Sequence, residues 1–174
     1  MPRPRRVTPP ATDTTTTYRP AAAEDCVQCI AVRGRTRQNA VSAELLHAKG
    51  IALESWPQDI RDSHLWGMVC LSDQVMVGYC FGDRRVGEVV LLALLPAREA
   101  RGIGRLLLQG VIDTLYRDGL ERAGLDCRSD PGSLSCAGYR HLGWRSTGDL
   151  DAAQDELLDY VPRRTLATCP PDIH

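Results

Sequence analysis

The segment that most constrains the fold lies in the middle of the chain, where an apolar run, two glycines and an amphipathic stripe follow one another. Residues 86–95 carry apolar side chains on both faces, which predicts a central strand, and Pro96 ends it. Apolar residues then recur at helical spacing from Ile103, which predicts a helix with one buried face. Gly102 and Gly104 lie at the junction. This order favours an anion site, because the first amides of a helix have no partner within it.

The composition of this loop limits the anion that it can hold. Gly102 and Gly104 allow a ligand to approach the backbone, and Arg101 and Arg105 add positive charge. A nucleoside-triphosphate loop would need a lysine that this segment lacks. A dinucleotide fingerprint would need a third glycine where Leu107 stands. The loop therefore holds a different phosphate ligand, or it is a plain helix start with flexible glycines.

The periodicity of the whole chain predicts an α/β fold with a mixed, mostly antiparallel sheet of about six to seven strands and helices on both faces. Short spacers between the middle strands imply antiparallel neighbours. The expected strands are residues 18–21, 65–71, 75–81, 86–95, 123–127, 144–147 and 156–161. The expected helices are residues 25–32, a segment from Ser42 to Gly50, one from Ser55, the stripe from Ile103, and one from Ser133 to Leu142.

The composition indicates one globular domain. A length of 174 residues, with 43% hydrophobic and 25% charged residues, suits a single core. We expect a disordered arm over residues 1–17, one domain over residues 18–167 and a loose tail over residues 168–174. The net charge of -1 argues against a nucleic-acid partner. No apolar run approaches the length of about 20 residues that a membrane helix needs.

The seven cysteines are odd in number and irregularly spaced, and no secretory signal pattern precedes them. We therefore expect no disulfide framework and a cytoplasmic location. Cys26 and Cys29 form a CxxC pair without a second pair, so we interpret them as buried side chains rather than redox or zinc residues. His47 and His64 have no second ligand at metal spacing, so we expect no metal site.

Three separated motifs resemble the GNAT superfamily of acetyl-coenzyme A-dependent N-acetyltransferases. The run LALLPAREARGIGRLLLQG resembles its motif A, in which a bulged strand ends near a proline and a Q/R-x-x-G-x-G/A loop opens a helix. Glu99 departs from this pattern, since it stands where the family has Gln or Arg. Residues 138–144, GYRHLGW, resemble the late motif FYxxLGF, and residues 19–25 resemble the opening strand and helix. The motifs occur in the family's order and span nearly the whole domain.

This resemblance implies a site for acetyl-coenzyme A as co-substrate around motif A. It implies that the backbone N–H of Leu92 donates a hydrogen bond to the thioester oxygen. It also implies that Leu94 hydrogen-bonds the pantetheine arm. The residues that it implies around the pyrophosphate are Ala100, Arg101, Gly102, Ile103, Gly104 and Arg105.

The same resemblance implies two catalytic side chains. Tyr139 matches the tyrosine acid of the family, and Glu88 matches the glutamate base of its histone-acetylating branch. Both roles are needed. A lysine-like amine is almost fully protonated at neutral pH, so a base must remove a proton before the amine attacks. The sulfur of coenzyme A leaves more easily as a thiol than as a thiolate, so an acid helps. The alternatives are a core aromatic role for Tyr139 and a water or another carboxylate as base. We expect direct transfer rather than a covalent route through Cys127 or Cys136.

The sequence thus predicts an enzyme that acetylates a primary amine of a small molecule or a peptide. The alternative is a non-catalytic module of the same fold that senses acyl-coenzyme A. Tyr139 and the intact glycine loop favour the enzyme, whereas Glu99 favours the module. The acceptor pocket is expected between residues 33–56 and the last two strands, which could also pair two chains into a homodimer.

Overall fold

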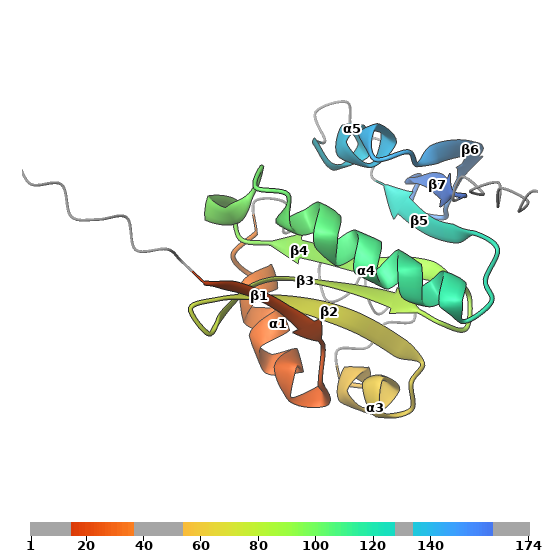
Figure 1. Cartoon of the computed structure of the whole chain (residues 1–174). Helices are drawn as coiled ribbons and strands as arrows, with labels where there is room; N and C mark the ends of the chain where they lie inside the picture. The colour runs from red at the N-terminus through yellow and green to blue at the C-terminus, as the bar shows by residue number, and fades with distance from the viewer. Residues whose placement is uncertain (1–14, 37–53, 128–133, 162–174) are drawn as a thin grey trace, which may run out of the picture.

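The computed structural model describes residues 15–36, 54–127 and 134–161. These ranges form a seven-stranded sheet with helices on both faces (Figure 1). The strands are β1 Thr16–Pro20, β2 Leu65–Ser72, β3 Val75–Asp83, β4 Glu88–Leu94, β5 Ala123–Cys127, β6 Arg145–Leu150 and β7 Glu156–Tyr160. The α-helices are α1 Cys26–Arg33, α3 Trp56–Arg61, α4 Ile103–Arg117 and α5 Leu134–His141, with short 3-10 turns at Ala23–Asp25 and Pro96–Arg98.

The sheet runs in the order β1-β2-β3-β4-β5-β7-β6. Every neighbouring pair is antiparallel except β4 and β5, which are parallel. Short turns join β2 to β3 and β3 to β4, as antiparallel neighbours allow, whereas α4 forms the longer crossover that a parallel pair requires. The expected mixed, mostly antiparallel sheet is confirmed.

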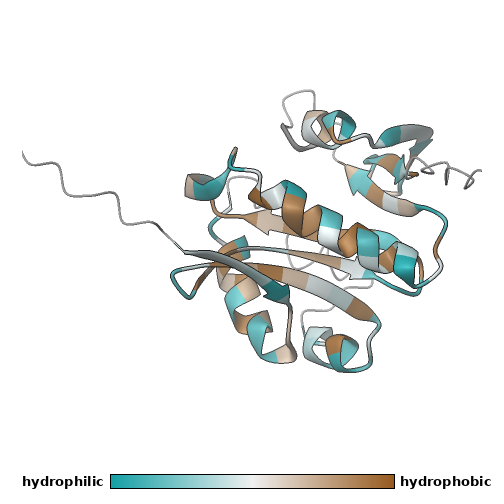
Figure 2. Cartoon of the chain, viewed as in Figure 1, coloured by the Kyte–Doolittle hydropathy of each residue, from teal (hydrophilic) through white to brown (hydrophobic). Residues whose placement is uncertain are grey.

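Two apolar cores lie on the two faces of the sheet. One core holds the buried stripe of α4, which consists of Ile103, Leu107, Leu108, Val111, Ile112 and Leu115. Figure 2 shows this stripe as apolar segments that alternate with polar ones along the helix. On the opposite face, α1 and α3 pack around Trp56, whose ring lies 5.5 Å from that of Phe81. Each helix turns its apolar face to the sheet, as the helical spacing predicted.

The observed elements follow the sequence pattern with small differences at their ends. The strand expected at residues 123–127 and the helix start at Ile103 coincide with the structure. β4 begins at Glu88, two residues later than expected, because Gly87 forms a turn with a φ of 77°. β1 begins at Thr16, so the last two residues of the arm expected over residues 1–17 belong to the sheet. That arm boundary is corrected by the pairing of β1 with β2.

Several expected segments lie outside the described residues. They are most of the arm, the helix from Ser42 to Gly50, the first residue of the helix expected from Ser133, and the tail over residues 168–174. None of the helices within the described ranges is long and apolar enough to cross a membrane.

The cysteines within the described residues divide into one disulfide and four buried thiols. Cys26 and Cys29 are buried in α1, and burial raises the pKa of Cys29 to about 12, which suits the interpretation of this pair as core side chains. Cys127 and Cys136 form a disulfide, with Cα atoms 5.7 Å apart. The expectation of reduced cysteines is wrong at this pair, because the fold brings β5 and α5 together in a way that cysteine number and spacing do not reveal.

Candidate active site

The loop before α4 leaves its helix N-terminus open. Ala100 and Gly102 adopt left-handed conformations, with φ of 58° and 78°, and no side chain caps the helix. The N–H of Leu106 is bonded to the carbonyl of Gly102, so the amides of residues 103–105 precede the first intrahelical bond. A Cβ atom at Gly102 or Gly104 would meet nothing within 4 Å. A ligand can therefore approach these amides closely, which fits a phosphate group.

The edge of β4 that faces β5 is open over most of its length. The register of the two strands pairs only Glu88 with Gly124, and beyond this point β5 diverges (Figure 1). β4 also carries a bulge at Val90, because Val89 and Leu91 pair with successive residues of β3. A bulge bends a strand and increases its twist, so it separates β4 from its parallel neighbour.

The backbone of β4 presents hydrogen-bonding groups to this open edge. The N–H of Leu95 donates to the carbonyl of Val77 on β3 at 2.8 Å. In an antiparallel pair, alternate residues bond to the partner strand and those between them point to the other edge. Leu92 and Leu94 therefore direct their N–H and C=O groups away from β3, towards the gap. Both residues assigned from motif A have the orientation that a ligand lying along β4 would need.

Tyr139 lies on the α4 side of the sheet, close to the same gap. Its ring contacts Trp144 edge-on, with centroids 6.1 Å apart, and it packs against the core beneath α4. Burial raises the pKa of Tyr139 above its ordinary value, and the nearby Cys80 thiol adds a smaller contribution. Cys80 lies directly opposite Leu92 in the β3–β4 register. Tyr139, Cys80 and Leu92 thus belong to the same apolar core beneath α4.

Glu88 lies at the closed end of the gap and on the other face. It is exposed, and its Cγ would lie 3.5 Å from a Cβ at Gly124. Leu125 and Ala123 point into the core beneath α4, so the alternation of a strand turns Gly124 to the opposite face. Glu88 and Tyr139 therefore flank the gap from opposite sides of the sheet.

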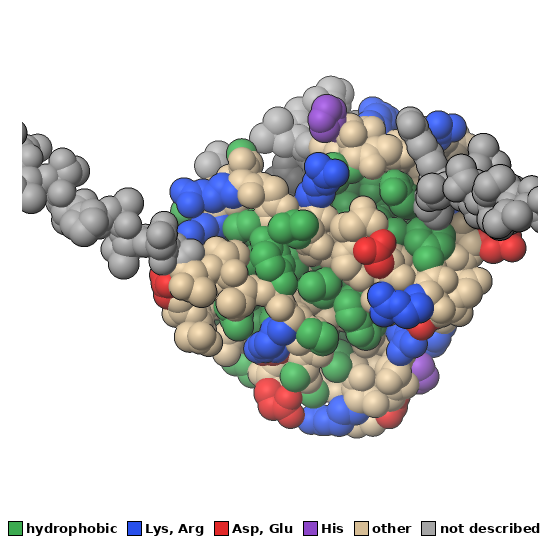
Figure 3. All heavy atoms as spheres, viewed as in Figure 1, with side chains coloured by type: hydrophobic (Ala, Val, Ile, Leu, Met, Phe, Trp, Pro, Cys, Tyr) green, Lys and Arg blue, Asp and Glu red, His purple; other side chains and the backbone are tan. Residues whose placement is uncertain are grey.

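Two cavities adjoin this region. One has a volume of about 1500 Å³ and extends from Glu88 and Gly124 along β5 to the β6–β7 hairpin. The other, of about 210 Å³, lies between α4 and the end of α5, with Arg105, Gln109 and His141 among its lining residues. Figure 3 shows apolar side chains exposed on the face of the molecule that carries α4. Most of residues 33–56, expected to build the acceptor pocket, lies outside the described residues.

Asp126 and Asp151, which line the larger cavity, form a group of three carboxylates with Asp155. Oxygens of Asp126, Asp151 and Asp155 lie within 4.8 Å of one another. Asp151 accepts hydrogen bonds at 2.8 Å from the backbone amides of Ala153 and Asp155, so this residue shapes the β6–β7 turn.

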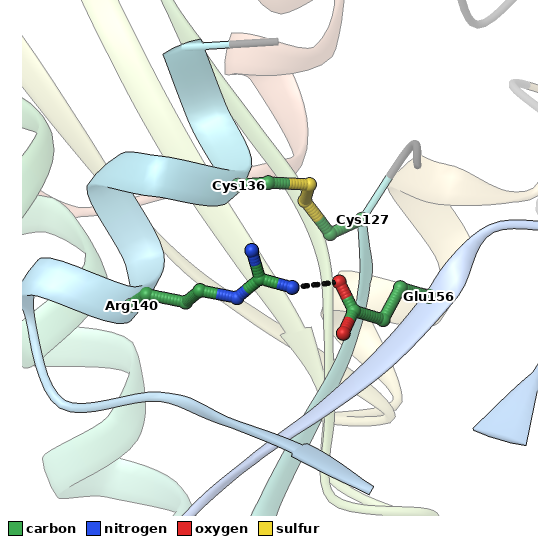
Figure 4. The surroundings of a disulfide bond; sticks show 4 residues. All are labelled: Cys127, Cys136, Arg140 and Glu156. Carbon is green, nitrogen blue, oxygen red and sulfur yellow. Dashed lines mark hydrogen bonds and ion pairs between the residues drawn. A yellow bond between two sulfur atoms is a disulfide. The ribbon is translucent and has the colours of Figure 1, made fainter. Parts of the chain in front are cut away.

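Sequence reasoning named Cys127 and Cys136 but missed the bond between them and the ion pair beside it, which hold α5 in place. Figure 4 shows the Cys127–Cys136 disulfide beside an ion pair between Arg140 and Glu156. Sequence reasoning also missed Cys80, because this residue belongs to no motif. Only the pairing of β3 with β4 places it opposite Leu92. Trp144 belongs to the late motif, so its position next to Tyr139 could have been inferred from that run.

Solved structures share this fold. PaiA N-acetyltransferase from Thermoplasma acidophilum, in complex with coenzyme A, has a TM-score of 0.70 at 16% identity, over 85% of this chain and 99% of that one. The ribosomal-protein-S18-alanine N-acetyltransferase of Escherichia coli has a TM-score of 0.61 at 15% identity, over 83% and 91%. YncA from Salmonella typhimurium, solved with acetyl-CoA, has a TM-score of 0.63 at 17% identity, over 89% and 98%.

Among curated proteins, none matches this sequence. The solved structures are too distant in sequence to show more than a common architecture. The family itself is established by the sequence, since the model of the acetyltransferase (GNAT) family matches residues 34–144, more than half of the chain. The chain therefore belongs to the GNAT family of acetyltransferases.

Proposed function

We propose that this protein transfers an acetyl group from acetyl-coenzyme A to a primary amine of a small molecule or a peptide. The observation that carries the proposal is the open edge of β4, which runs from the Glu88–Gly124 pair to the uncapped N-terminus of α4. The similar structures of PaiA and YncA, which hold coenzyme A and acetyl-CoA, support a ligand of this kind. The alanine acetyltransferase shows that the fold also serves peptide amines.

The chain offers two sets of binding groups. The amides of residues 103–105 hold the pyrophosphate, because they lack intrahelical partners and face open space. Arg101 and Arg105 add charge to the same anion. Leu94 bonds the pantetheine arm through its backbone, as a neighbouring strand would. When bound, acetyl-coenzyme A supplies an acetyl group activated as a thioester.

Leu92 and Tyr139 stabilise the charges that develop during transfer. The N–H of Leu92 donates to the carbonyl oxygen as it becomes an oxyanion, which is an effective use of a preorganised donor. The Tyr139 hydroxyl protonates the departing sulfur. A tyrosine hydroxyl is protonated at neutral pH and is available as a donor, and because burial raises the pKa of Tyr139, its proton moves as the C–S bond breaks.

The incoming amine must lose a proton from the other side of the gap. Glu88, or a water that it holds, accepts this proton, because Glu88 is exposed on the face opposite α5. The amine then attacks the thioester from one face while Tyr139 acts from the other. This arrangement suits direct transfer without a covalent enzyme intermediate.

The test is Tyr139→Phe, which keeps the ring and removes the proton donor. We expect kcat to fall about 10²-fold or more, because protonation matters chiefly in the transition state. The Kd for coenzyme A and the Tm should change little. Tyr116→Phe is the matched control: its hydroxyl bonds the carbonyl of Tyr160, so its loss should lower Tm and leave kcat unchanged.

Two outcomes would contradict the proposal. Full kcat in Tyr139→Phe would leave Tyr139 as a packing residue. Coenzyme A binding by calorimetry, without acetylation of any amine in a panel of small amines and peptides, would favour the non-catalytic acyl-coenzyme A sensor instead.

A further inference from the structure

Helix α5 carries Tyr139 and is joined to the sheet by a covalent tether. Cys136 in α5 is bonded to Cys127, the last residue of β5, and both cysteines are buried (Figure 4). The helix has only eight residues. Helices of this length are not stable alone, so its position depends on what holds it.

A second tether joins the same face of α5 to the same place in the sheet. Arg140 follows Cys136 by one helical turn, and its guanidinium pairs with the carboxylate of Glu156. Glu156 lies directly opposite Cys127 in the β5–β7 register. Both tethers therefore reach one cross-strand pair, and together they set the rotation and the axial position of α5.

The two tethers differ in strength. Arg140 is 54% exposed, and ion pairs of such exposed side chains contribute little to stability, because water and salt screen them. The disulfide is covalent and does not depend on salt or on side-chain order. It is therefore the stronger of the two tethers on the segment from Cys136 to Arg140, which includes Tyr139.

We propose that the Cys127–Cys136 disulfide positions Tyr139 at the open edge of β4, so that a dithiol reductant which opens this bond lowers the rate of acetyl transfer. This inference rests on the proposed function, in which Tyr139 is the acid. Cys127 and Cys136 are positioning residues here, since neither contacts the reacting atoms. Their effect passes through the hydroxyl of Tyr139, whose ring must keep its place in the core that also holds Leu92.

The chemistry of the opening is an ordinary thiol–disulfide exchange. A thiolate of the reductant attacks one sulfur of the pair, the S–S bond breaks, and a mixed disulfide forms. The second thiol of the reductant then displaces the remaining cysteine. The protein gains two electrons and two protons as two thiols, and the reductant becomes a cyclic disulfide.

The experiment compares four proteins with and without dithiothreitol: wild type, Tyr139→Phe, the double variant Cys127→Ser/Cys136→Ser, and the control Cys26→Ala. Peptide mapping by mass spectrometry verifies the cross-link in oxidised wild type, Tyr139→Phe and Cys26→Ala, and its absence from the double variant. In wild type and Cys26→Ala, reduction should lower kcat about 10- to 100-fold, since small misplacements of a reacting group have effects of this size. The Kd for coenzyme A should change less than about threefold, because the loop before α4 is untouched.

The double variant lacks the disulfide, so its kcat should equal that of reduced wild type and should not change with the concentration of dithiothreitol. In Tyr139→Phe, reduction should leave kcat unchanged, because the group that the disulfide positions is already absent. Hydrogen exchange supplies a readout apart from activity: reduction should speed exchange of the α5 amides and not those of α4.

The possible outcomes distinguish the positioning role of the disulfide from the acid role of Tyr139. Unchanged kcat and unchanged α5 exchange on reduction of wild type would overturn the positioning role, even where Tyr139→Phe is slow. Equal slowing of wild type and Tyr139→Phe would also overturn it, since the disulfide would then act on stability alone. Full activity in Tyr139→Phe would instead overturn the acid role in the proposed function. Chemical reduction of wild type decides the question if the double variant does not fold.

Discussion

Replacement of Gly104 by valine tests the phosphate site at the start of α4. The new side chain would occupy the open space beside the first-turn amides, where no protein atom lies within 4 Å of its Cβ. Gly104 is helical and has no positive φ, so the substitution adds no backbone strain. The difference in helix propensity between glycine and valine is below about 0.5 kcal/mol, so the free protein should keep its stability.

The affinity for coenzyme A should fall, because the valine methyl groups would hold the pyrophosphate away from the amides. The loss of one hydrogen bond to a charged group costs about 1.5–3 kcal/mol. At about 1.4 kcal/mol per factor of ten, this corresponds to a Kd that is about 10- to 150-fold higher. Isothermal titration calorimetry with coenzyme A measures the change directly, and a thermal melt of the free protein checks the fold.

Gly34→Val is the matched control. Gly34 ends α1 in a right-handed helical conformation, and the atoms nearest to its Cβ would be 3.8 Å away. It lies on the opposite face of the sheet, so the same substitution there should leave the Kd unchanged. A Kd for Gly104→Val within about twofold of wild type would refute the phosphate site. A valine side chain beside the first-turn amides must hinder any phosphate that binds them.

Two further predictions concern carboxylates. Glu88→Gln should lower kcat/KM by about 10²–10⁴-fold and remove the acidic limb of its pH profile; a limb that persists would assign the base role to water or another carboxylate. Asp25 is 5% exposed and accepts two hydrogen bonds from Arg19, which hold its pKa below the ordinary 3.8. Its stabilisation is therefore complete above this ordinary value and is lost as the pH falls through the lower folded value. Asp25→Asn should lower the free energy of unfolding by about 1–3 kcal/mol near neutral pH, and urea titrations should show this difference shrinking as the pH falls below the ordinary value of 3.8. A difference that is constant with pH would contradict the role of the Arg19 pair.

The sequence by itself determined the elements whose signals are local. The apolar stripe from Ile103 predicted α4 because a helix face repeats within a few residues, and the junction at Gly102 and Gly104 predicted an open helix start. The run at residues 123–127 predicted β5 to the residue, since a strand alternates over its own length. The late motif located Tyr139 in a short helix, and this too is a property of neighbouring residues.

Only the tertiary structure decided how these elements meet. The bulge at Val90 and the divergence of β5 beyond Gly124 depend on the pairing of strands far apart in the chain, and no local pattern encodes that register. The same register places Cys80 opposite Leu92, and Tyr139 of α5 packs into the core that holds both residues. The Cys127–Cys136 bond escaped prediction for this reason as well, because whether two thiols meet depends on the packing of β5 against α5. Local periodicity specifies where each strand and helix lies along the chain, whereas the geometry of a site at their junction follows from packing between segments that share no sequence signal.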